Sequence, residues 1–375
     1  MGTRAAKTIA FSVAAVAMVL VCIEGVASIA FGLLTDRETR DRPVAERLHT
    51  RFDPEIGWVG AANVLIPDMY GPGISVQTNE RGFRSERPRE PMGAAGFDRI
   101  ICAGDSFTFG YGVSNADTWC ALLEEQGNRR VRTVNMGLGG FGLDQTYLWY
   151  RREAPTIPHA LTIVALVFED LERMMSDDFL GYGKPIMRVR NGRLTVDNVP
   201  VPESTIGRRL APAIAFARGF KSFELLSSLL RRFRSSPGPA SAGAEEMLAL
   251  SAEVMEAIRD ESARHGSVPV FVYLPTEADY RPGSRDLARQ RLSVESARLG
   301  VTFIDLVPAL RRLSIRDMAT MFIPPGVMEY AYAAGHYTVR GNRFVRDAII
   351  DEARRHPRLR LLQGEGARVE PEPGD

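Results

Sequence analysis

Residues 101–110 read ICAGDSFTFG and place an acid and a hydroxyl, Asp105 and Ser106, directly after an apolar run that is typical of a strand. A serine hydroxyl becomes a useful nucleophile when a neighbouring base removes its proton. Ser and Asp are also the commonest helix N-caps, so the same residues are equally typical of a helix start. The residues Gly104-Asp105-Ser106 alone do not decide between a nucleophile and a helix cap.

His336 is the histidine best placed to act as that base. Four other histidines fall in a stem, a connection, a helix end and the C-terminal tail: His49, His159, His265 and His356. His336, in AYAAGHYTVRGNRF, lies in a loop just before the last amphipathic segment. From such a loop a histidine can reach the carboxyl edge of a sheet and take a proton from a serine. The alternative is a histidine that bonds backbone where a helix begins.

A glycine motif, GLGGFG at 137–142, suggests a second kind of chemistry. It matches G-x-G-x-x-G, follows a strand and opens a helix, and Glu169-Asp170 ends the next strand, where a ribose-binding acid would lie. These features indicate a dinucleotide site. Against it, the motif follows the second strand of the domain rather than the first, and a lone glycine pattern has low specificity.

The elements that must position these residues alternate between strand and helix. The segment LTIVALVF at 161–168 has no polar alternation, as expected of a strand covered on both faces. Alternation with right-handed crossovers predicts a three-layer α/β/α domain over a mainly parallel sheet, with ligands at the carboxyl ends of the strands. Strands are predicted at 98–104, 130–136, 161–168, 267–275 and 301–306, and helices at 116–126, 143–153, 245–264, 284–299 and from 338.

The pattern breaks between residues 171 and 244. PIMRVRNGRLTVDNVPV alternates around Asn191-Gly192, a strong hairpin signal. Arg-rich helical stretches and a Pro/Gly/Ser linker follow, so this block is predicted to be an insertion or lid. We expect these segments, in chain order: a short tail 1–7, a membrane anchor 8–34, a stem and irregular region 35–95, half of the domain 96–170, the insertion 171–244, the second half 245–357 and a disordered tail 358–375.

The N-terminal segment 8–34 is almost entirely apolar. As a helix it would be about 40 Å long, which exceeds the ~30 Å hydrocarbon core of a bilayer. We therefore expect an uncleaved single-span anchor, with a cleaved signal peptide ending near Ser28-Ile29-Ala30 as the alternative. Glu24 lies within the span and is expected either to face a membrane partner or to reach the interface.

Composition narrows the range of partners. The chain has 375 residues, of which 45% are hydrophobic and 25% charged, and its net charge is +1. Because the net charge is close to zero, no strong positive electrostatic field would attract nucleic acid. No cluster of cysteines and histidines has the spacing of a metal site. We expect neither a nucleic-acid partner nor a metal or other cofactor.

Taken together, the motifs resemble the SGNH/GDSL hydrolase superfamily, in its membrane-anchored bacterial branch tied to exopolysaccharide acylation. The resemblance covers roughly residues 52–356. The segments that carry it, in order, are DPEIGW (53–58), TNERGFRS (78–85), AGDSFTFGYGV (103–113), VNMGLGGFGLDQ (134–145), VALVFEDL (164–171) and GHYTVRGNRFVRDA (335–348).

This resemblance implies a flavodoxin-like SGNH domain and a role for each motif. Ser106 matches the nucleophile, with its own N–H as an oxyanion donor, and Gly140 matches the glycine that supplies the second donor N–H. His336 matches the general base. Asp105 and Asp170 match supporting acids. Glycines at 137–142 would then let backbone approach an oxyanion, with no nucleotide involved.

Two positions depart from the family pattern. The third oxyanion donor is normally an asparagine side chain, and Glu169 stands there, where an ionised carboxylate would repel an oxyanion. The triad aspartate normally lies two or three residues before the histidine, at positions that Ala334 and Ala333 occupy. The sequence therefore predicts a Ser–His site whose histidine is oriented by a backbone carbonyl or by an acid from elsewhere, such as Glu329.

The resemblance implies a serine esterase or O-acyltransferase that acts on acyl groups of a polysaccharide through an acyl-serine intermediate. It would be a single-pass protein of the bacterial inner membrane with its domain in the periplasm, and an integral membrane protein could supply its acyl groups. A catalytically degenerate glycan-binding module is the main alternative. Cys102 and Cys120 are expected either to pair in an oxidising compartment or to stay as buried thiols.

Overall fold

The computed structural model describes residues 48–87, 98–126, 131–203 and 240–363, with seven isolated positions before residue 23. The chain divides into two compact units, Met1–Asp41 with Ser204–Ala240, and Arg42–Glu203 with Ser241–Asp375. Only the second unit is described at length. Within the described ranges, none of the helices combines the length and apolarity that a bilayer crossing requires. The predicted anchor 8–34 and the helical part of the insertion, 204–239, lie outside these ranges except at the isolated positions.

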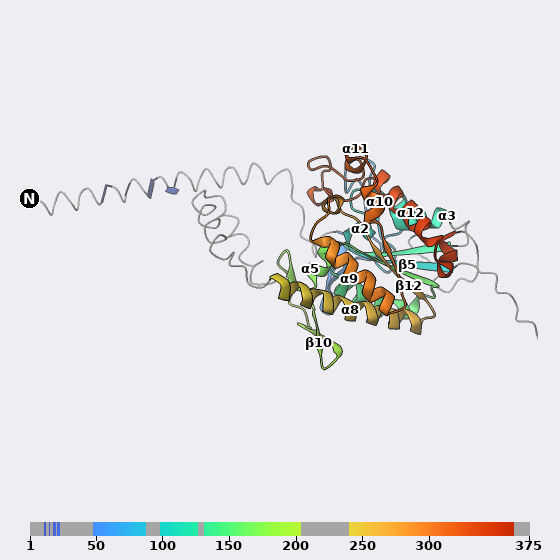
Figure 1. The fold of residues 1–375 in the computed structure, drawn as a ribbon. Helices are drawn as coiled ribbons and strands as arrows, with labels where there is room; N and C mark the ends of the chain where they lie inside the picture. The colour runs from blue at the N-terminus through green and yellow to red at the C-terminus, as the bar shows by residue number, and fades with distance from the viewer. Residues whose placement is uncertain are drawn as a thin grey trace, which may run out of the picture. The chain divides into compact units, whose positions relative to one another are not determined.

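A five-stranded parallel sheet forms the centre of the described unit (Figure 1). Its order is β13-β12-β7-β5-β6, which is the flavodoxin-like order when the strands are numbered along the chain. The strands run parallel, but the direction in which successive strands are added to the sheet reverses between β5 and β7. The carboxyl ends of these two strands therefore border the crevice where such sheets bind ligands. The strands are β5 (Asp98–Gly104), β6 (Val131–Gly137), β7 (Leu161–Leu166), β12 (Val268–Tyr273) and β13 (Thr302–Asp305).

Helices cover both faces of the sheet, as the apolar strands require (Figure 1). Alternate strand residues divide between two hydrophobic cores: Ile101 and Ala103 lie in one, Ile100 and Cys102 in the other. The first core is closed by α4 (Leu143–Glu153), α8 (Ala240–Arg264) and α9 (Arg285–Arg298), and the second by α3 (Trp119–Gln126), α10 (Val307–Arg311) and α12 (Val339–Ala353). The predicted α/β fold with a central parallel sheet is confirmed.

Residues 48–87, within the predicted stem and irregular region 35–95, pack on the domain. They form two small antiparallel pairs, β1 (Thr50–Asp53) with β2 (Gly57–Gly60), and β3 (Leu65–Ile66) with β4 (Val76–Gln77). Trp58 is fully buried in the first core, and its indole N–H donates to the Gly139 carbonyl at 3.0 Å. This region therefore supports the loop that carries the glycine motif.

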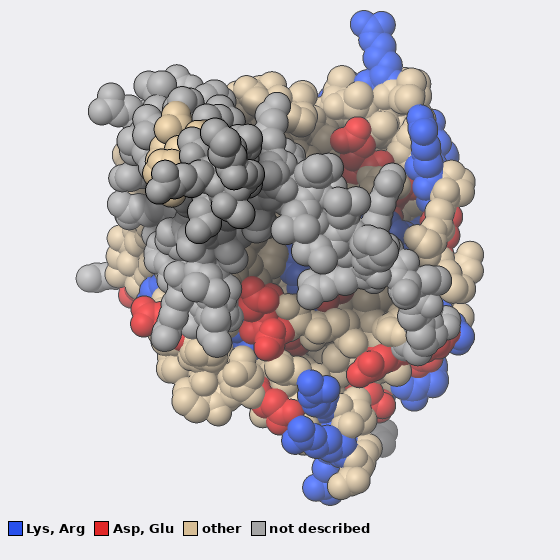
Figure 2. Space-filling view, turned by 90° about the vertical axis from the view of Figure 1, so that its left-hand side faces the viewer, with Lys and Arg blue, Asp and Glu red and all other residues tan. Residues whose placement is uncertain are grey.

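The start of the insertion is a short two-stranded pair followed by the predicted hairpin. β8 (Asp178–Phe179) pairs with β9 (Tyr182–Gly183), and β10 (Ile186–Arg190) pairs with β11 (Arg193–Asp197). Asn191 and Gly192 both have positive φ, as a tight hairpin turn requires. In Figure 2, basic side chains gather at the lower tip, where Figure 1 places this hairpin, whose exposed arginines are Arg188, Arg190 and Arg193.

Several predicted boundaries were wrong. The strand predicted over 161–168 ends at Leu166, because Val167 and Phe168 begin α5 (Phe168–Arg173). The disordered tail predicted from 358 does not begin there: η6 (Pro357–Gln363) packs Leu359 and Leu362 into the second core. Short helices also occur where none was predicted: α2 (Ser106–Phe109), α11 (Ile315–Ala319), η3 (Ala154–Thr156), η4 (Glu277–Tyr280) and η5 (Ala331–Ala333). The predicted helix 116–126 is divided into η2 (Asn115–Asp117) and α3.

Candidate active site

Ser106 is both the first residue of a helix and the partner of a base. It follows β5 as the first residue of α2, and Asp105 is the N-cap, whose Oδ1 accepts from the Phe107 N–H at 2.9 Å. The capping role therefore belongs to Asp105. Ser106 is free for another function at the carboxyl edge of the sheet, where it is only 5% exposed.

His336 meets Ser106 across 230 residues of sequence. Its Nε2 lies 2.7 Å from the Ser106 Oγ, within the range of a strong hydrogen bond. The loop that carries it is fixed by backbone bonds, because the Ile323 N–H donates to the His336 carbonyl and the Gly335 N–H donates to the Ile323 carbonyl, both at 2.8 Å. The serine hydroxyl and the imidazole are thus within proton-transfer distance.

Two aromatic rings flank the imidazole. The Phe107 ring lies 4.5 Å from the His336 ring between centroids, with a 32° interplanar angle, and the Tyr111 ring lies 5.1 Å away at 43°. Burial among these groups lowers the pKa of His336 to about 4, partly opposed by the charge of Asp105, while Arg173 acts in the same direction as burial. The ring is therefore held neutral, in the form that accepts a proton.

No carboxylate in the described part of the chain is hydrogen-bonded to the far nitrogen of His336. Its Nδ1 is buried and has no partner of normal geometry there, while the carbonyls of Ala333 and Ala334 act to raise the pKa of the ring. Glu329, the acid considered from sequence, is exposed. Of the two sequence alternatives, the geometry favours orientation by backbone carbonyls.

Two backbone N–H groups are available as oxyanion donors. Neither the Ser106 nor the Gly140 N–H donates to another residue within the described ranges. Gly140 lies in the loop between β6 and α4, and its φ of +80° favours glycine. A Cβ there would come within 2.5 Å of the Phe179 ring, so a side chain at this position would displace the loop.

Glu169 does not have the position of a neutral donor. Its Oε1 accepts from the Arg285 Nη2 at 2.7 Å, and Arg285 also donates to Thr276 at 3.0 Å and lies over the Phe168 ring. An ion-paired carboxylate has no hydrogen to offer an oxyanion. The sequence made Glu169 a doubtful third donor, and its ion pair with Arg285 adds to the case against that role. The candidate donors that remain are the backbone N–H groups of Ser106 and Gly140.

Asp105 and Asp170 form a buried acidic pair beside Ser106. Asp105 Oδ2 lies 3.4 Å from the Ser106 Oγ, and Asp170 Oδ2 accepts from the Val167 N–H at 2.9 Å. Arg173 contacts both carboxylates. Burial and the neighbouring Asp105 raise the pKa of Asp170 well above its usual range, while Arg173 acts to lower it.

The loop after α2 is held by a buried arginine from the GFRS segment. Arg84 donates to the carbonyls of Phe109 at 2.7 Å, Gly110 and Val113, and to Asn115 Oδ1 at 2.9 Å. Burial lowers its pKa to about 10, which leaves it charged at neutral pH. Arg84 therefore fixes the turn that presents Tyr111 to His336.

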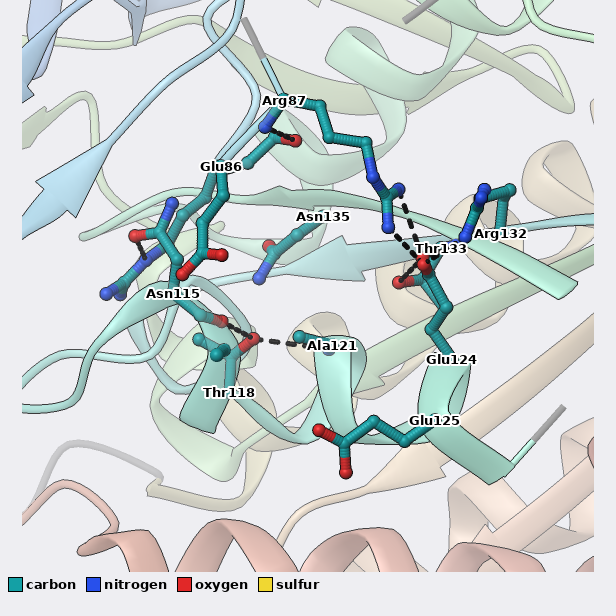
Figure 3. A pocket seen from close by; sticks show the side chains of 13 residues that line it. Glu86, Arg87, Asn115, Thr118, Ala121, Glu124, Glu125, Arg132, Thr133 and Asn135 are labelled. Atoms are coloured by element: carbon teal, nitrogen blue, oxygen red, sulfur yellow. Dashed lines mark hydrogen bonds and ion pairs between the residues drawn. The ribbon is translucent and has the colours of Figure 1, made fainter. Parts of the chain in front are cut away.

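A pocket of about 450 Å³ lies next to Arg84, at the edge strand β6 (Figure 3). Arg87 and Arg132 converge there on Glu124, whose pKa is lowered because these bonds outweigh its burial. Neither Ser106 nor His336 lines this pocket. Arg87 and Arg132 neutralise Glu124, so we assign these side chains a structural role and not a catalytic one.

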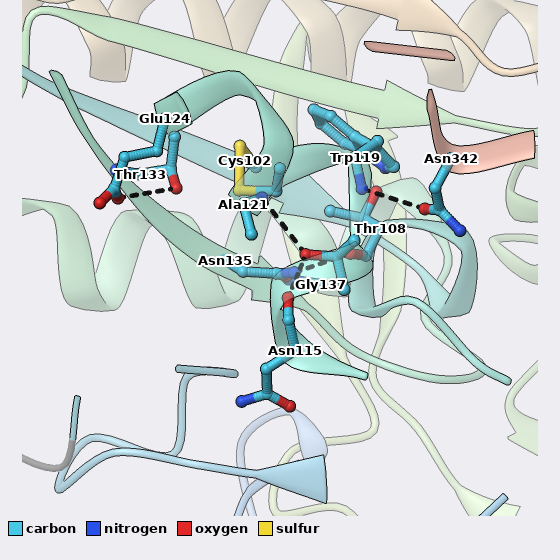
Figure 4. The surroundings of a disulfide bond; sticks show 12 residues. Cys102, Thr108, Asn115, Trp119, Ala121, Glu124, Thr133, Asn135, Gly137 and Asn342 are labelled. Atoms are coloured by element: carbon cyan, nitrogen blue, oxygen red, sulfur yellow. Dashed lines mark hydrogen bonds between the residues drawn. A yellow bond between two sulfur atoms is a disulfide. The ribbon is translucent and has the colours of Figure 1, made fainter. Parts of the chain in front are cut away.

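Cys102 and Cys120 form a disulfide that joins β5 to α3 (Figure 4). Trp119, next to Cys120, donates its backbone N–H to Asn342 Oδ1 at 3.0 Å, and Asn342 belongs to α12. The strand that precedes Ser106, β5, and the helix that follows His336, α12, are thus tied to the same element, α3.

The glycine motif does not have the surroundings of a dinucleotide site. Phe179 covers Gly140, where a pyrophosphate would approach the backbone. Glu169 is paired with Arg285, and Asp170 is buried against Arg173, so neither acid is placed to bind a ribose hydroxyl. The geometry favours the oxyanion interpretation of these glycines.

Sequence reasoning missed four side chains around the site. Phe107 and Tyr111 flank His336, Phe179 covers Gly140, and Arg173 joins the acidic pair. The i,i+3 spacing of Asp170 and Arg173 was a readable signal of an ion pair on a helix. No local pattern indicates the other three, because their partners are distant in sequence.

No protein-family model and no curated protein sequence matches the chain. Solved structures do match. A member of the lipolytic G-D-S-L family from Veillonella parvula is 13% identical, with 68% of this chain and 96% of that chain covered and a TM-score of 0.38. The native aryl esterase of M. smegmatis is 14% identical, with 69% and 99% covered and a TM-score of 0.36.

A catalytic mutant of an acetylxylan esterase from Geobacillus stearothermophilus is 10% identical, with 69% and 95% covered and a TM-score of 0.38. These three solved structures are described as a lipolytic G-D-S-L protein, an aryl esterase and an acetylxylan esterase, and the similarity to them is one of fold alone.

Proposed function

We propose that the protein is a serine esterase or O-acyltransferase that forms an acyl-enzyme on Ser106. The observation that carries this proposal is the 2.7 Å contact between Ser106 Oγ and His336 Nε2 at the carboxyl edge of the sheet. Two further observations support it: the N–H groups of Ser106 and Gly140 donate to no other residue in the described ranges, and the buried imidazole is neutral.

The first half-reaction moves one proton and forms one bond. His336 Nε2 takes the Ser106 proton as Oγ attacks the carbonyl carbon of an ester, and the negative oxygen is bound by the two N–H groups. When the tetrahedral intermediate collapses, the ester C–O bond breaks and the leaving alkoxide takes the proton from His336. The second half-reaction repeats these steps in reverse with a new hydroxyl as nucleophile.

That second nucleophile distinguishes the two activities. Water gives an esterase, and a sugar hydroxyl gives an O-acyltransferase. An O-acylated polysaccharide as substrate or acceptor follows from the motif resemblance. The proposed location is extracytoplasmic, with residues 8–34 as an inner-membrane anchor. It is supported by the apolar length of that segment and by the Cys102–Cys120 disulfide, since disulfides persist in oxidising compartments.

Labelling of the full-length chain with a fluorophosphonate tests the catalytic proposal. We expect one label on the peptide that contains Ser106, and no label on Ser106→Ala or His336→Ala. Ser85→Ala is the matched control, because Ser85 is a part-buried serine whose hydroxyl accepts from the Arg87 backbone N–H, and it should label like the wild type. A wild type that neither labels nor cleaves an aryl acetate, but still binds an acetylated glycan, would favour the binding-module alternative.

Product analysis then separates the activities. With an aryl acetate as donor and a polysaccharide as acceptor, an esterase releases free acetate, whereas a transferase places acetyl groups on the sugar, detected by mass spectrometry. For the location, alkaline phosphatase fused after residue 375 should be active in cells. An inactive but stably produced fusion would place the domain in the cytoplasm and overturn the proposed topology.

A further inference from the structure

We infer that Arg173 is a positioning residue that sets the spacing of the two oxyanion donors, Ser106 and Gly140. This inference rests on the proposed acyl-serine function and adds to it a residue that touches neither the nucleophile nor the base. Arg173 is the last residue of α5, at the start of the insertion, and its side chain is 19% exposed.

One nitrogen of Arg173 contacts three acceptors from three segments. Its Nη1 lies 3.3 Å from Asp105 Oδ2 and 3.0 Å from the Phe141 carbonyl, and it also bonds Asp170 Oδ1. Asp105 immediately precedes Ser106, and Phe141 immediately follows Gly140. The guanidinium therefore joins the residues next to both oxyanion donors.

This placement matters because an oxyanion hole stabilises the negative oxygen only when both N–H donors lie at hydrogen-bond distance from it. Its donors must lie roughly 2.7–3.1 Å from the developing charge. The two donor loops follow different strands, β5 and β6, so the strands alone do not fix the separation of their loops. A displacement of about 1 Å between reacting groups can reduce a rate on the order of 100-fold.

The chemistry of the site explains why an arginine is suitable. Asp105 is 0% exposed and Asp170 2%, so a cation is needed to hold them in the interior. A guanidinium is planar and carries several donors in fixed directions, whereas an ammonium is a point charge. Lysine could keep the charge balance here, but it would not reach the acids and the Phe141 carbonyl with the same geometry.

Contacts on the other side of Arg173 hold it in place. Its carbonyl accepts from the Lys184 Nζ at 2.6 Å, and that ammonium also donates to Asp144 Oδ2 at 2.7 Å in the first turn of α4. The Phe179 ring lies 5.5 Å from the guanidinium carbon and covers Gly140. The insertion thus packs against the oxyanion loop through both Lys184 and Phe179.

Steady-state kinetics of aryl acetate cleavage by the full-length Arg173→Lys variant test the inference. We expect kcat to fall on the order of 10- to 100-fold with KM changed less than about twofold, because donor geometry and not ground-state binding is altered. Arg190→Ala is the matched control. It removes an arginine from the same insertion that is paired with an aspartate, Asp197, far from any donor loop, and should keep wild-type kcat.

Two further readouts separate positioning from folding. Arg173→Ala should regain part of its kcat when guanidinium is added at millimolar concentration, and Arg190→Ala should show no response. Because Arg173 acts to lower the pKa of His336, the acid limb of kcat/KM in Arg173→Ala should also move to higher pH. If Arg173→Ala does not fold, Arg173→Lys decides the question alone.

Wild-type kcat in Arg173→Lys, or a rise in KM that matches the loss of kcat/KM, would overturn the inference while the proposed function stands. A wild-type protein that fails to label and to turn over would instead overturn the proposed function. The two failures are therefore distinguishable from the same set of proteins.

Discussion

The imidazole of His336 should stay unprotonated at pH values well below 7. Burial lowers the pKa of this ring from the usual 6.5 to about 4. At about 1.4 kcal/mol per pKa unit, the environment favours the neutral ring by about 3 kcal/mol. At pH 6, roughly 1% of the ring would be protonated, against about three-quarters for an ordinary histidine.

The rate of fluorophosphonate labelling between pH 4 and pH 9 measures this directly, since it reports the Ser–His pair without the deacylation step. We expect a flat profile down to about pH 5 and a single acid limb near pH 4. Glu329→Gln should give the same profile, because that side chain is exposed, whereas the ring is buried. A limb between pH 6 and pH 7 would refute the reasoning, since it would mean that a carboxylate pairs with Nδ1.

The same shift links His336 to stability. Below pH 6.5 the unfolded chain takes up a proton that the folded ring refuses, so stability is lost as pH falls from 6.5 towards 4. The loss reaches about 3 kcal/mol once the pH is below the folded pKa. His336→Gln should remove this part of the pH dependence in urea denaturation, and an unchanged dependence would contradict the assignment.

Three more predictions concern the surroundings of the site. Gly140→Ala should reduce the rate of labelling on the order of 100-fold, because the added Cβ would clash with the Phe179 ring. Gly192→Ala is the control: this glycine also has positive φ, but a Cβ there meets open space, so the variant should label normally and lose only about 1 kcal/mol of stability. Lys184→Met should lower the free energy of unfolding by about 3–5 kcal/mol by leaving Asp144 unpaired, and Lys184→Met/Asp144→Leu should recover most of it. Reduction of Cys102–Cys120 should lower the unfolding free energy by about 3 kcal/mol, and equal urea midpoints with and without reductant would show that the bond does not form.

The sequence by itself determined the local elements. Strand β7 lacks polar alternation, α4 was predicted at its observed bounds, and Asn191-Gly192 specified the hairpin turn, because each is encoded by the periodicity or backbone preference of adjacent residues. The motif resemblance also predicted that Ser106, Gly140 and His336 belong to one site. Boundaries failed where long-range packing decides them, as for Leu359, which looked like part of a polar tail and is buried against α12 and its neighbours.

Only the tertiary structure decided how that site is assembled. Strand order brings the ends of β5, β6 and β7 to one edge, and this placed Ser106 against a histidine 230 residues away. It also set Phe107 and Tyr111 around the imidazole, paired Glu169 with Arg285, and joined Arg173 to both donor loops. Such contacts leave no periodicity in the chain, because the free energy of a hydrogen bond or an aromatic contact depends on where its partners meet in space and not on their spacing in sequence.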